Sequence, residues 1–362
     1  MIDLKFWRGK KVLVTGHTGF KGAWLTLLLH ELGSEIYGIS HEAGCSESFY
    51  SEVIMNRSLI QEHWVDIRNF KELSTVICEI NPNIIFHFAA QSQVKVGYQS
   101  PTLTYETNAV GTANMIEAIR DLKNLNGMIV ATSDKVYARN ALSQPSTETD
   151  ALAGTDPYSL SKVLTELVIQ NFKDSYPEYG NYKKIGIIRA GNVVGGGDQA
   201  SYRLIPDIFR SVSENRVFKL RMPHAIRPWQ HVLDCLSGYI LLAEKISTGE
   251  IKSEEAIFNI GPNAKNSLSV LALINLIQES VYRMHKTDIN FEIEALHSYE
   301  LNKLELNSSK AAKMLQWESI FEIDEVVRLT SQWYLAQYKK EELLDLSLSQ
   351  ISLLIERCSS VN

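Results

Sequence analysis

The chain has 362 residues, of which 45% are hydrophobic and 22% are charged, and its formal net charge is -6. That length and hydrophobic share exclude a disordered chain and allow one large domain with a smaller one. The acidic balance argues against a generalised basic surface for nucleic acid or an anionic membrane, so any anionic ligand must be bound locally.

Short apolar runs alternate with helical stretches through the first half of the chain. The runs predict strands at residues 11–15, 35–39, 63–65, 84–88, 128–132 and 184–188, and the stretches between them predict helices at 21–32, 70–80, 102–122 and 157–175. Several of these strands are apolar on both faces, as strands of a parallel sheet are. The alternation predicts an α/β fold built on a Rossmann-type, doubly wound parallel sheet.

The alternation of predicted strands and helices ends near residue 190, where a glycine cluster is followed by mixed helices and short strands. We therefore predict two domains, with residues 1–190 forming the doubly wound sheet and residues 191–362 forming a smaller, mixed α/β domain. Residues 226–258 are expected to return in part to the first domain. The leucines and isoleucines of 341–358 predict a terminal helix that packs on the second domain.

Three glycines follow the first predicted strand in the sequence VLVTGHTGFKG. Gly16, Gly19 and Gly22 would allow a tight turn, a close approach of the backbone to a pyrophosphate, and contact between helix and strand. The amino terminus of the following helix, with Phe20 beside it, would supply N–H groups to the anion. A flexible turn would also use glycines, but the strand before and the helix after them favour a dinucleotide site.

The next predicted strands end on residues suited to the rest of a dinucleotide. Glu42 is the acid nearest the end of the second strand and can take the adenosine ribose hydroxyls. No arginine stands in that region for a 2'-phosphate, so NAD is favoured over NADP. Asp66, followed by Ile67, can meet the adenine edge, although a helix cap explains Asp66 equally well. Ala89 and Ala90 are small enough for the backbone to lie close to the cofactor.

The fifth predicted strand stops abruptly on a hydroxyl, an acid and an amine in the sequence IVATSDKVY. On a surface loop, Asp134 and Lys135 would simply form an exposed ion pair after Ser133, as most such neighbours do. Their position favours a functional role, because doubly wound folds bind ligands at the carboxyl ends of their parallel strands.

A tyrosine and a lysine stand four residues apart in the predicted helix that begins PYSLSK. This spacing puts Tyr158 and Lys162 on one face, where the ammonium can stabilise the phenolate and lower the pKa of the tyrosine. A solvated helix face would also explain the pair. Its place after the fifth strand of a dinucleotide-binding pattern favours a chemical role.

Together these motifs resemble the extended short-chain dehydrogenase/reductases, in which the TGxxGxxG turn, a serine after the fifth strand and YxxxK stand in the same order. Within that superfamily the chain is most similar to the CDP-glucose 4,6-dehydratases. The resemblance rests on FWRGKKVLVTGHTGFKGAWL, HFAAQSQV, TSDKVY, DPYSLSK, RAGNVVGGGD, RLIPDI, IRPWQHVLDCLSGY and LELNSSKAAKMLQW. It implies an NAD-dependent lyase of deoxysugar biosynthesis, such as that of O-antigen, with a nucleotide-sugar substrate, CDP-hexose in particular.

The resemblance also implies a role for each polar residue. Tyr158, assisted by Lys162, would take the proton of the C4 hydroxyl while Ser133 hydrogen-bonds that oxygen and NAD accepts the hydride. Lys135 would then remove the C5 proton, and Asp134 would protonate the departing C6 hydroxyl. An ordinary lysine has a pKa of about 10.4, so burial and nearby positive charges are expected to lower that of the base.

Arginine forks are the expected clamps for a nucleoside diphosphate. By the same resemblance, Arg227 in IRPWQHV is the first candidate, with Asn192, Arg203 and His231 as further substrate-binding residues. Arg227 could instead stack in an interface between domains, and Asn192 could be a turn residue.

Three functional hypotheses follow. The favoured one is a sugar-nucleotide 4,6-dehydratase that converts CDP-D-glucose to CDP-4-keto-6-deoxy-D-glucose, or that acts on another nucleotide hexose. A C4 epimerase or 4-ketoreductase on the same fold would need Ser133, Tyr158 and Lys162 but no acid–base pair after the serine. A non-catalytic nucleotide sensor would have no chemical reason to keep those three side chains together.

Assembly and location are predicted from analogy and from what the sequence lacks. In the superfamily, the helix ending near residue 122 and the YxxxK helix pair across a homodimer interface, to which Leu164, Leu167 and Val168 could contribute unless they are core residues. The four cysteines form no CxxC pair, no secretory leader precedes them, and no apolar run approaches the roughly 20 residues of a membrane span. A cytoplasmic protein with no nucleic-acid, membrane or metal partner is expected.

Overall fold

The computed structural model describes residues 2–41, 47–138, 144–294 and 305–359. At its centre is a seven-stranded sheet with the strand order β11-β6-β5-β4-β1-β2-β3, in which neighbouring strands run parallel. The strands are β1 (Lys11–Thr15), β2 (Glu35–Ser40), β3 (Gln61–Trp64), β4 (Ile84–His87), β5 (Gly127–Ala131), β6 (Ile185–Ala190) and β11 (Ile257–Ile260). The predicted doubly wound α/β sheet is confirmed.

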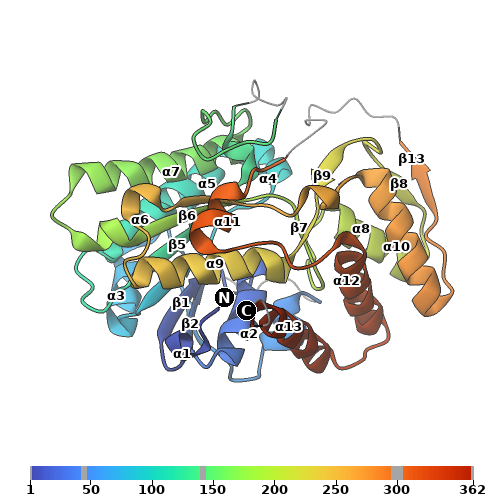
Figure 1. Cartoon of the computed structure of the whole chain (residues 1–362), viewed down its shortest axis with the longest axis horizontal. Coiled ribbons are helices and arrows are strands. Elements are labelled where there is room, and N and C mark those ends of the chain that lie inside the picture. The colour runs from blue at the N-terminus through green and yellow to red at the C-terminus, as the bar shows by residue number, and fades with distance from the viewer. Residues whose placement is uncertain (1, 42–46, 139–143, 295–304, 360–362) are drawn as a thin grey trace.

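Helices cover both faces of this sheet (Figure 1). Val12 and Val14 of β1 belong to the apolar layer under α2 and α9, whereas Leu13 between them belongs to the layer under α3, α6 and α7. The covering helices are α2 (Phe20–Glu31), α3 (Phe70–Ile80), α6 (Gly111–Ala118), α7 (Pro157–Ser175) and α9 (Val232–Ser247). Because side chains alternate between two buried layers, the strands are apolar at successive positions, which is why they could be predicted.

The predicted helix over residues 102–122 is divided in the structure. It consists of α5 (Pro101–Tyr105), a π-helical turn η2 (Glu106–Val110) and α6, and it is preceded by α4 (Val94–Gln99). The π turn carries Asn108, whose side-chain amide donates to Gln91 O at 2.9 Å and to Ser161 Oγ at 2.8 Å. Turns of this kind re-aim a side chain within a helix, and here the turn directs a polar group toward α7.

A smaller unit lies beside the sheet, toward the right of Figure 1. It contains α8 (Leu204–Ser213), α10 (Val270–His285), α12 (Ile323–Tyr338) and the strand pairs β8 (Phe218–Leu220) with β13 (Phe291–Ile293) and β9 (Ile226–Pro228) with β12 (Ser267–Ser269). Between these segments the chain returns to the sheet through α9 and β11. A single cut at residue 190 therefore does not divide the chain into two continuous units.

The C-terminal segments bridge the two parts. Helix α11 (Ser309–Leu315) packs on α9 and β11, and α13 (Leu343–Ser359) contacts α9, α12 and the π turn η1 (Tyr50–Ile54). The predicted terminal helix therefore exists, but it lies against the sheet-bearing part as well as the second unit. Its apolar residues occur at mixed spacing, so the helix can cover both parts.

Two kinds of feature are absent from the described ranges. In residues 2–41, 47–138, 144–294 and 305–359, no helix combines the length and apolarity needed to cross a membrane. The same part of the chain holds no group of three or more histidine, cysteine or acidic side chains arranged to bind a metal ion.

Candidate active site

The turn between β1 and α2 has room only for glycine at two positions. Gly16 has a φ of +73°, and a Cβ added to it would lie 2.7 Å from the backbone nitrogen of Ala89. A Cβ on Gly22 would lie 2.2 Å from the carbonyl oxygen of Gly16. Helix α2 starts after Gly19 without a side-chain cap. Backbone N–H groups at the start of α2 are therefore open to an anion, and the geometry fits the pyrophosphate of a dinucleotide.

One large cavity runs from this turn across the carboxyl ends of the strands to the second unit. Its volume is about 1520 Å³, above the roughly 300–1,000 Å³ of a site for one small molecule. The predicted residues that line it are Gly16, Gly19, Phe20, Gly22, Asp66, Ile67, Ala89, Ala90, Ser133, Asp134, Lys135, Tyr158, Lys162, Asn192, Arg203 and Arg227. The cavity can therefore hold two ligands side by side.

Helix α7 places Tyr158 and Lys162 at the wall of this cavity. Asp156 caps the helix by accepting the N–H of Ser159 at 3.0 Å, so Tyr158 lies in the first turn. Lys162 Nζ donates to the carbonyl oxygen of Ala131 at 3.0 Å, at the last residue of β5. Burial lowers the pKa of Lys162 to about 8. Burial raises the pKa of the Tyr158 phenol, contrary to the lowering expected from the sequence, and a hydrogen bond with Ser133 opposes that rise.

The hydroxyl, acid and amine that follow β5 form the short helical turn η3 (Asp134–Val136). Ser133 Oγ accepts the backbone N–H of Lys135 at 3.3 Å and donates to Asp134 Oδ1 at 3.1 Å. This turn keeps the strand from continuing and holds all three side chains at the cavity. The side chain of Lys135 is half-buried, so the surface ion pair considered from sequence does not describe this geometry.

The second carboxylate oxygen of Asp134 is distinctive. Asp134 is 5% exposed, and its Oδ2 is buried without a hydrogen-bond partner among the described residues. Burial raises the pKa of Asp134, whereas the nearby charges of Lys135, Arg227 and Lys21 lower it in part. The raised pKa favours the protonated carboxyl, which is the form that a general acid needs.

The predicted substrate-binding residues lie on the side of the second unit. Arg227, in β9, is buried, and its Nη1 donates to the carbonyl oxygen of Ile226 at 2.9 Å. Arg203 precedes α8 and forms an ion pair with Asp198 at 2.8 Å. Asn192 lies directly before the short strand β7 (Val193–Val194). The fold therefore brings two guanidinium groups and an amide to the cavity that holds the tyrosine–lysine pair.

His231 lies elsewhere. It is fully buried at the start of α9, where its Nδ1 accepts the N–H of Leu233 at 3.3 Å, and its ring contacts Trp24 and Phe321. Burial lowers its pKa to about 3, so the ring is neutral. His231 is not among the described residues that line the cavity, and we do not carry it into the proposed substrate site. Glu42 falls outside the described residues.

Several cations that line the cavity were not singled out from the sequence, among them Arg68 and Lys21. Arg68 binds Asp66 through paired contacts, with Nη2 to Oδ2 at 2.5 Å, and lowers the pKa of that carboxyl. Lys21 lies in the first turn of α2, where a cation is unfavourable beside the helix dipole. Lys21 could have been recognised from the sequence, because it stands within the glycine turn. Arg68 stands two residues after Asp66, and no sequence motif marks it.

The sequence of this chain is similar to that of a known family and of several known proteins. Residues 13–330 match the family model described as GDP-mannose 4,6 dehydratase. A CDP-glucose 4,6-dehydratase of Salmonella typhimurium is 38% identical over 357 residues, covering 97% of this chain and 98% of that protein. A UDP-glucose 4-epimerase of Mycoplasma pneumoniae is 26% identical, covering 85% of this chain and 91% of that protein.

Solved structures share the fold at lower identity. UDP-glucose 4-epimerase of Thermotoga maritima, solved with UDP-glucose, has a TM-score of 0.77 at 22% identity and covers 90% of this chain and 99% of its own. The dTDP-glucose 4,6-dehydratase of Bacillus anthracis, solved in complex with NAD, has a TM-score of 0.75 at 22% identity and covers 93% of this chain and 100% of its own. The same layered sheet therefore serves both epimerases and dehydratases.

Proposed function

The chain belongs to the GDP-mannose 4,6-dehydratase family of extended short-chain dehydrogenase/reductases, and from that premise we propose that it is an NAD-dependent sugar-nucleotide 4,6-dehydratase. Its proposed substrate is CDP-D-glucose, a choice supported by the name of the relative that is 38% identical over 97% of this chain. The observation that carries the proposal is that a tyrosine–lysine pair and an acid–lysine pair line one cavity, namely Tyr158, Lys162, Asp134 and Lys135.

The glycine turn supports NAD as the cofactor. The backbone at Gly16 and Gly19 and the open start of α2 would hold the pyrophosphate, and Asp66 with Ile67 would meet the adenine. When bound, NAD accepts a hydride from C4 of the hexose and later returns it to C6. The ribose contact predicted for Glu42 stays a prediction.

Tyr158 is the proposed base for C4 oxidation. It takes the proton of the C4 hydroxyl, and Ser133 hydrogen-bonds the same oxygen. Lys162, with a pKa of about 8, keeps its positive charge at pH 7 and stabilises the phenolate one helical turn away. These three residues supply the proton handling that any enzyme oxidising C4 on this fold requires.

Asp134 and Lys135 are the proposed acid and base for elimination. The C4 ketone acidifies the C5 proton, which Lys135 removes. Asp134 protonates the C6 hydroxyl, which leaves as water, so a double bond forms between C5 and C6. Lys135 would return its proton to C5, and bound NAD would supply the hydride that C6 needs, which gives the 6-deoxy product. Burial of Asp134 and its unpartnered Oδ2 support its role as the proton donor.

The nucleotide half of the substrate is assigned to the second unit. Arg227 is the proposed diphosphate clamp, because a guanidinium can bind two phosphate oxygens at once. It also lies close enough to Asp134 to influence the pKa of that carboxyl, which supports a diphosphate clamp near the proposed position of the reacting sugar. Asn192 and Arg203 are proposed as further contacts at the same wall of the cavity.

Two alternatives make different products. A C4 epimerase has no use for an acid–base pair after Ser133, so Asp134 and Lys135 argue against it. A 4-ketoreductase would reduce its substrate and leave a nicotinamide cofactor oxidised. A nucleotide sensor would bind the substrate and return it unchanged.

The test is incubation of the purified protein and NAD with CDP-, dTDP-, UDP- and GDP-linked hexoses. We expect CDP-glucose to react with the highest kcat/KM and to lose one water in mass, giving a 4-keto product that absorbs in alkali. A product of unchanged mass would contradict dehydration in favour of epimerisation. Conversion of a different nucleotide hexose would correct the substrate while keeping the reaction.

A cytoplasmic homodimer that supplies a deoxysugar pathway, such as that of O-antigen, is also proposed. Leu167, on the outer side of α7, is 55% exposed, and Leu160 and Val110 are exposed on α7 and η2. Exposed apolar side chains on α7 and the adjacent η2 suit an interface between two copies. Light scattering of the purified protein would give its mass and test the dimer.

A further inference from the structure

A third side chain continues the row of Tyr158 and Lys162 along α7. Glu166 lies one turn beyond Lys162, and its Oε1 accepts the hydroxyl proton of Thr132 at 2.7 Å. Lys162 holds Ala131, and Tyr158 meets Ser133, so α7 contacts three consecutive residues at the end of β5. Glu166 is 4% exposed. Glu166 is not among the described residues that line the cavity, so any effect on the chemistry passes through the residues that it contacts.

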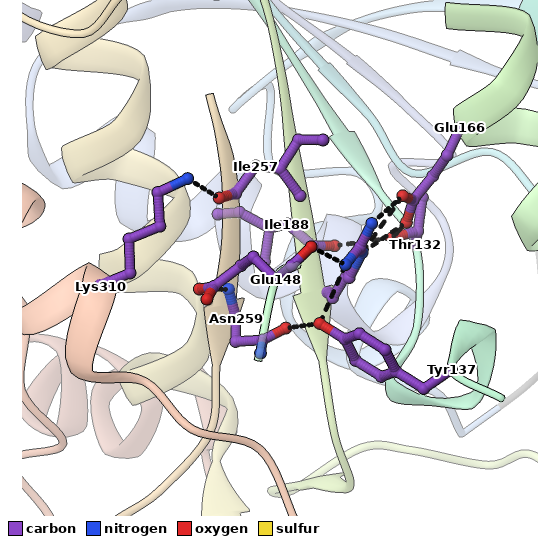
Figure 2. A network of polar contacts seen from close by, with 9 residues as sticks. Thr132, Tyr137, Glu148, Glu166, Ile188, Ile257, Asn259 and Lys310 are labelled. Atoms are coloured by element: carbon purple, nitrogen blue, oxygen red, sulfur yellow. Dashed lines mark hydrogen bonds and ion pairs between the residues drawn. The ribbon is translucent and has the colours of Figure 1, made fainter. Parts of the chain in front are cut away.

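Arg189 of β6 is the partner of Glu166. Its Nη2 lies 2.5 Å from Oε2 and its Nε 3.0 Å from Oε1, so the pair is bidentate. The remaining nitrogen, Nη1, donates to the hydroxyl of Tyr137 at 3.0 Å and to the carbonyl oxygen of Glu148 at 3.1 Å (Figure 2). One guanidinium therefore joins α7 to two positions in the chain segment that follows Lys135.

Tyr137 connects this fork to the turn that carries Asp134 and Lys135. It directly follows η3 and donates its hydroxyl proton to Asn259 Oδ1 in β11 at 2.5 Å (Figure 2). Burial raises the pKa of Tyr137 to about 12, so the phenol keeps the proton that it donates. Its ring packs with Val136 and Val163, the latter from α7. The end of the η3 turn is therefore fixed to β11 and, through Arg189, to α7.

Asn259 secures the other end of the same segment. Its backbone N–H donates to Glu148 Oε1 at 2.8 Å, and its side-chain amide donates to the carbonyl oxygen of Ser146 at 2.8 Å. Ser146 lies in the cavity lining. Both ends of the segment between Tyr137 and Glu148 thus meet the network around one buried ion pair.

A buried ion pair of this kind is weak evidence for stability. The desolvation cost of two charges is several kcal/mol per ion and is offset only when every remaining donor and acceptor is matched. Replacement of such pairs by apolar side chains is often neutral for stability. A fixed geometry is the better explanation here, because the bonds of Arg189 run to the two elements that carry the proposed chemistry.

We propose that Arg189 is a positioning residue that holds the Tyr158–Lys162 face of α7 and the Asp134–Lys135 turn at a fixed separation, so that C4 oxidation and C5/C6 elimination are completed in one cavity. The inference rests on the proposed dehydratase function. Neither Arg189 nor Glu166 touches substrate. Loss of the network should uncouple the two half-reactions, so that NADH and the 4-keto hexose accumulate before water is lost.

The first test is Tyr137→Phe, which removes the bond between Arg189 and β11 and keeps the ring in its apolar cluster. We expect C4 oxidation, seen as NADH absorbance in a single turnover, to stay near normal, and elimination to slow by about tenfold to a hundredfold. KM for the nucleotide sugar should not change. Tyr37→Phe is the matched control, since Tyr37 is similarly buried, donates its hydroxyl proton to Glu35 and is not among the described residues that line the cavity.

The second test removes both charges in the double variant Glu166→Gln/Arg189→Met. Glutamine can still accept from Thr132, and no charge is left buried alone. We expect a melting temperature close to that of the wild type with accumulated NADH and a lowered kcat. Arg189→Lys, which keeps the charge without the fork, should restore little of the coupling.

The wild type is assayed in parallel with CDP-glucose and the other nucleotide hexoses. An active wild type whose Tyr137→Phe and double variants show the same kcat and no accumulated NADH overturns the positioning role and leaves the proposed function standing. A wild type that makes no dehydrated product from any of them overturns the proposed function, and the inference with it.

Discussion

Asp134 and Lys135 are neighbours in the chain, but their environments differ. The carboxyl is almost fully buried, and one of its oxygens has no hydrogen-bond partner in the part of the chain that the structure describes. The lysine is half-buried and reaches the same cavity. Burial favours the neutral acid. The environment of Asp134 therefore suits proton donation, and the role of Lys135 as the base is part of the proposed function.

This contrast leads to a prediction for Lys135→Met. Methionine keeps the length and apolar stem of lysine but cannot remove the C5 proton. We expect NADH to form in a single turnover, because Tyr158, Ser133 and Lys162 are intact, while the 4-keto-6-deoxy product falls by about 10²- to 10⁴-fold. NADH absorbance and product mass measure the two half-reactions separately.

The control is Lys123→Met, the same substitution at an exposed lysine that does not line the cavity. It should leave both half-reactions unchanged. Normal dehydration by Lys135→Met would show that another group removes the C5 proton, and the assignment of the base would then be wrong.

At the scale of elements, the close contact between α2 and the glycine turn after β1 decides whether a dinucleotide fits. A Cβ on Gly22 would meet the carbonyl oxygen of Gly16 at 2.2 Å, a distance at which α2 must move away from β1. For Gly22→Ala we expect the affinity for NAD to fall by about tenfold or more, equivalent to about 1.4 kcal/mol. Isothermal titration with NAD measures the loss directly.

Gly180→Ala is the matched control, because an added Cβ there meets nothing within 4 Å and the residue has no positive φ. It should bind NAD as the wild type does. Equal NAD affinity in Gly22→Ala would mean that the turn tolerates a wider helix–strand contact, which would remove the main geometric support for the cofactor.

At this scale, the sequence could predict features whose pattern lies within a short stretch of the chain. The β1 strand, α3 and α7 match their predicted ranges, because alternation and helical spacing act within a few residues. The Tyr158–Lys162 pair was visible for the same reason. The network of Arg189 was not, since its partners come from α7, the segment after η3 and, through Tyr137, β11. No periodic pattern links residues so far apart in the chain.

Tertiary context also explains the two differences in position. The helix predicted over 102–122 is interrupted at Asn108, where bonds to Gln91 and Ser161 outweigh regular helical pairing. His231 stands in a motif that the resemblance associated with substrate, yet the fold uses it to cap α9 beneath the cavity wall. Whether a residue that follows a strand faces the ligand depends on how α9 packs. The spacing of residues in the sequence does not specify that packing.

For the whole molecule, α9 ties the N-terminus to the sheet. Helix α1 (Leu4–Trp7) is held by Glu244 near the end of α9, which accepts the indole N–H of Trp7 at 2.6 Å and the backbone N–H of Asp3 at 3.0 Å. Because α13 also packs on α9, both ends of the chain depend on the same helix. A charge buried at this junction therefore affects global stability.

Burial raises the pKa of Glu244 to about 7, above its ordinary value of 4.5. Since the folded state then binds this proton more tightly than the unfolded state, the free energy of unfolding decreases as pH rises between these two values and stays reduced above them. Glu244→Gln keeps an acceptor for Trp7 and Asp3 but cannot ionise. We expect the variant to match the wild type at pH 4, below both pKa values, and to exceed it at pH 8 by up to about 3 kcal/mol.

Urea denaturation of both proteins at the two pH values measures this difference, because the variant and the wild type share every other titrating group. Glu79→Gln, at an exposed position on α3, should shift neither midpoint. A wild type more stable than Glu244→Gln at pH 8 would mean that the ionised carboxylate stabilises the junction through its bonds to Trp7 and Asp3 by more than its burial costs. The N-terminal helix would then be held by charge rather than by a neutral hydrogen bond.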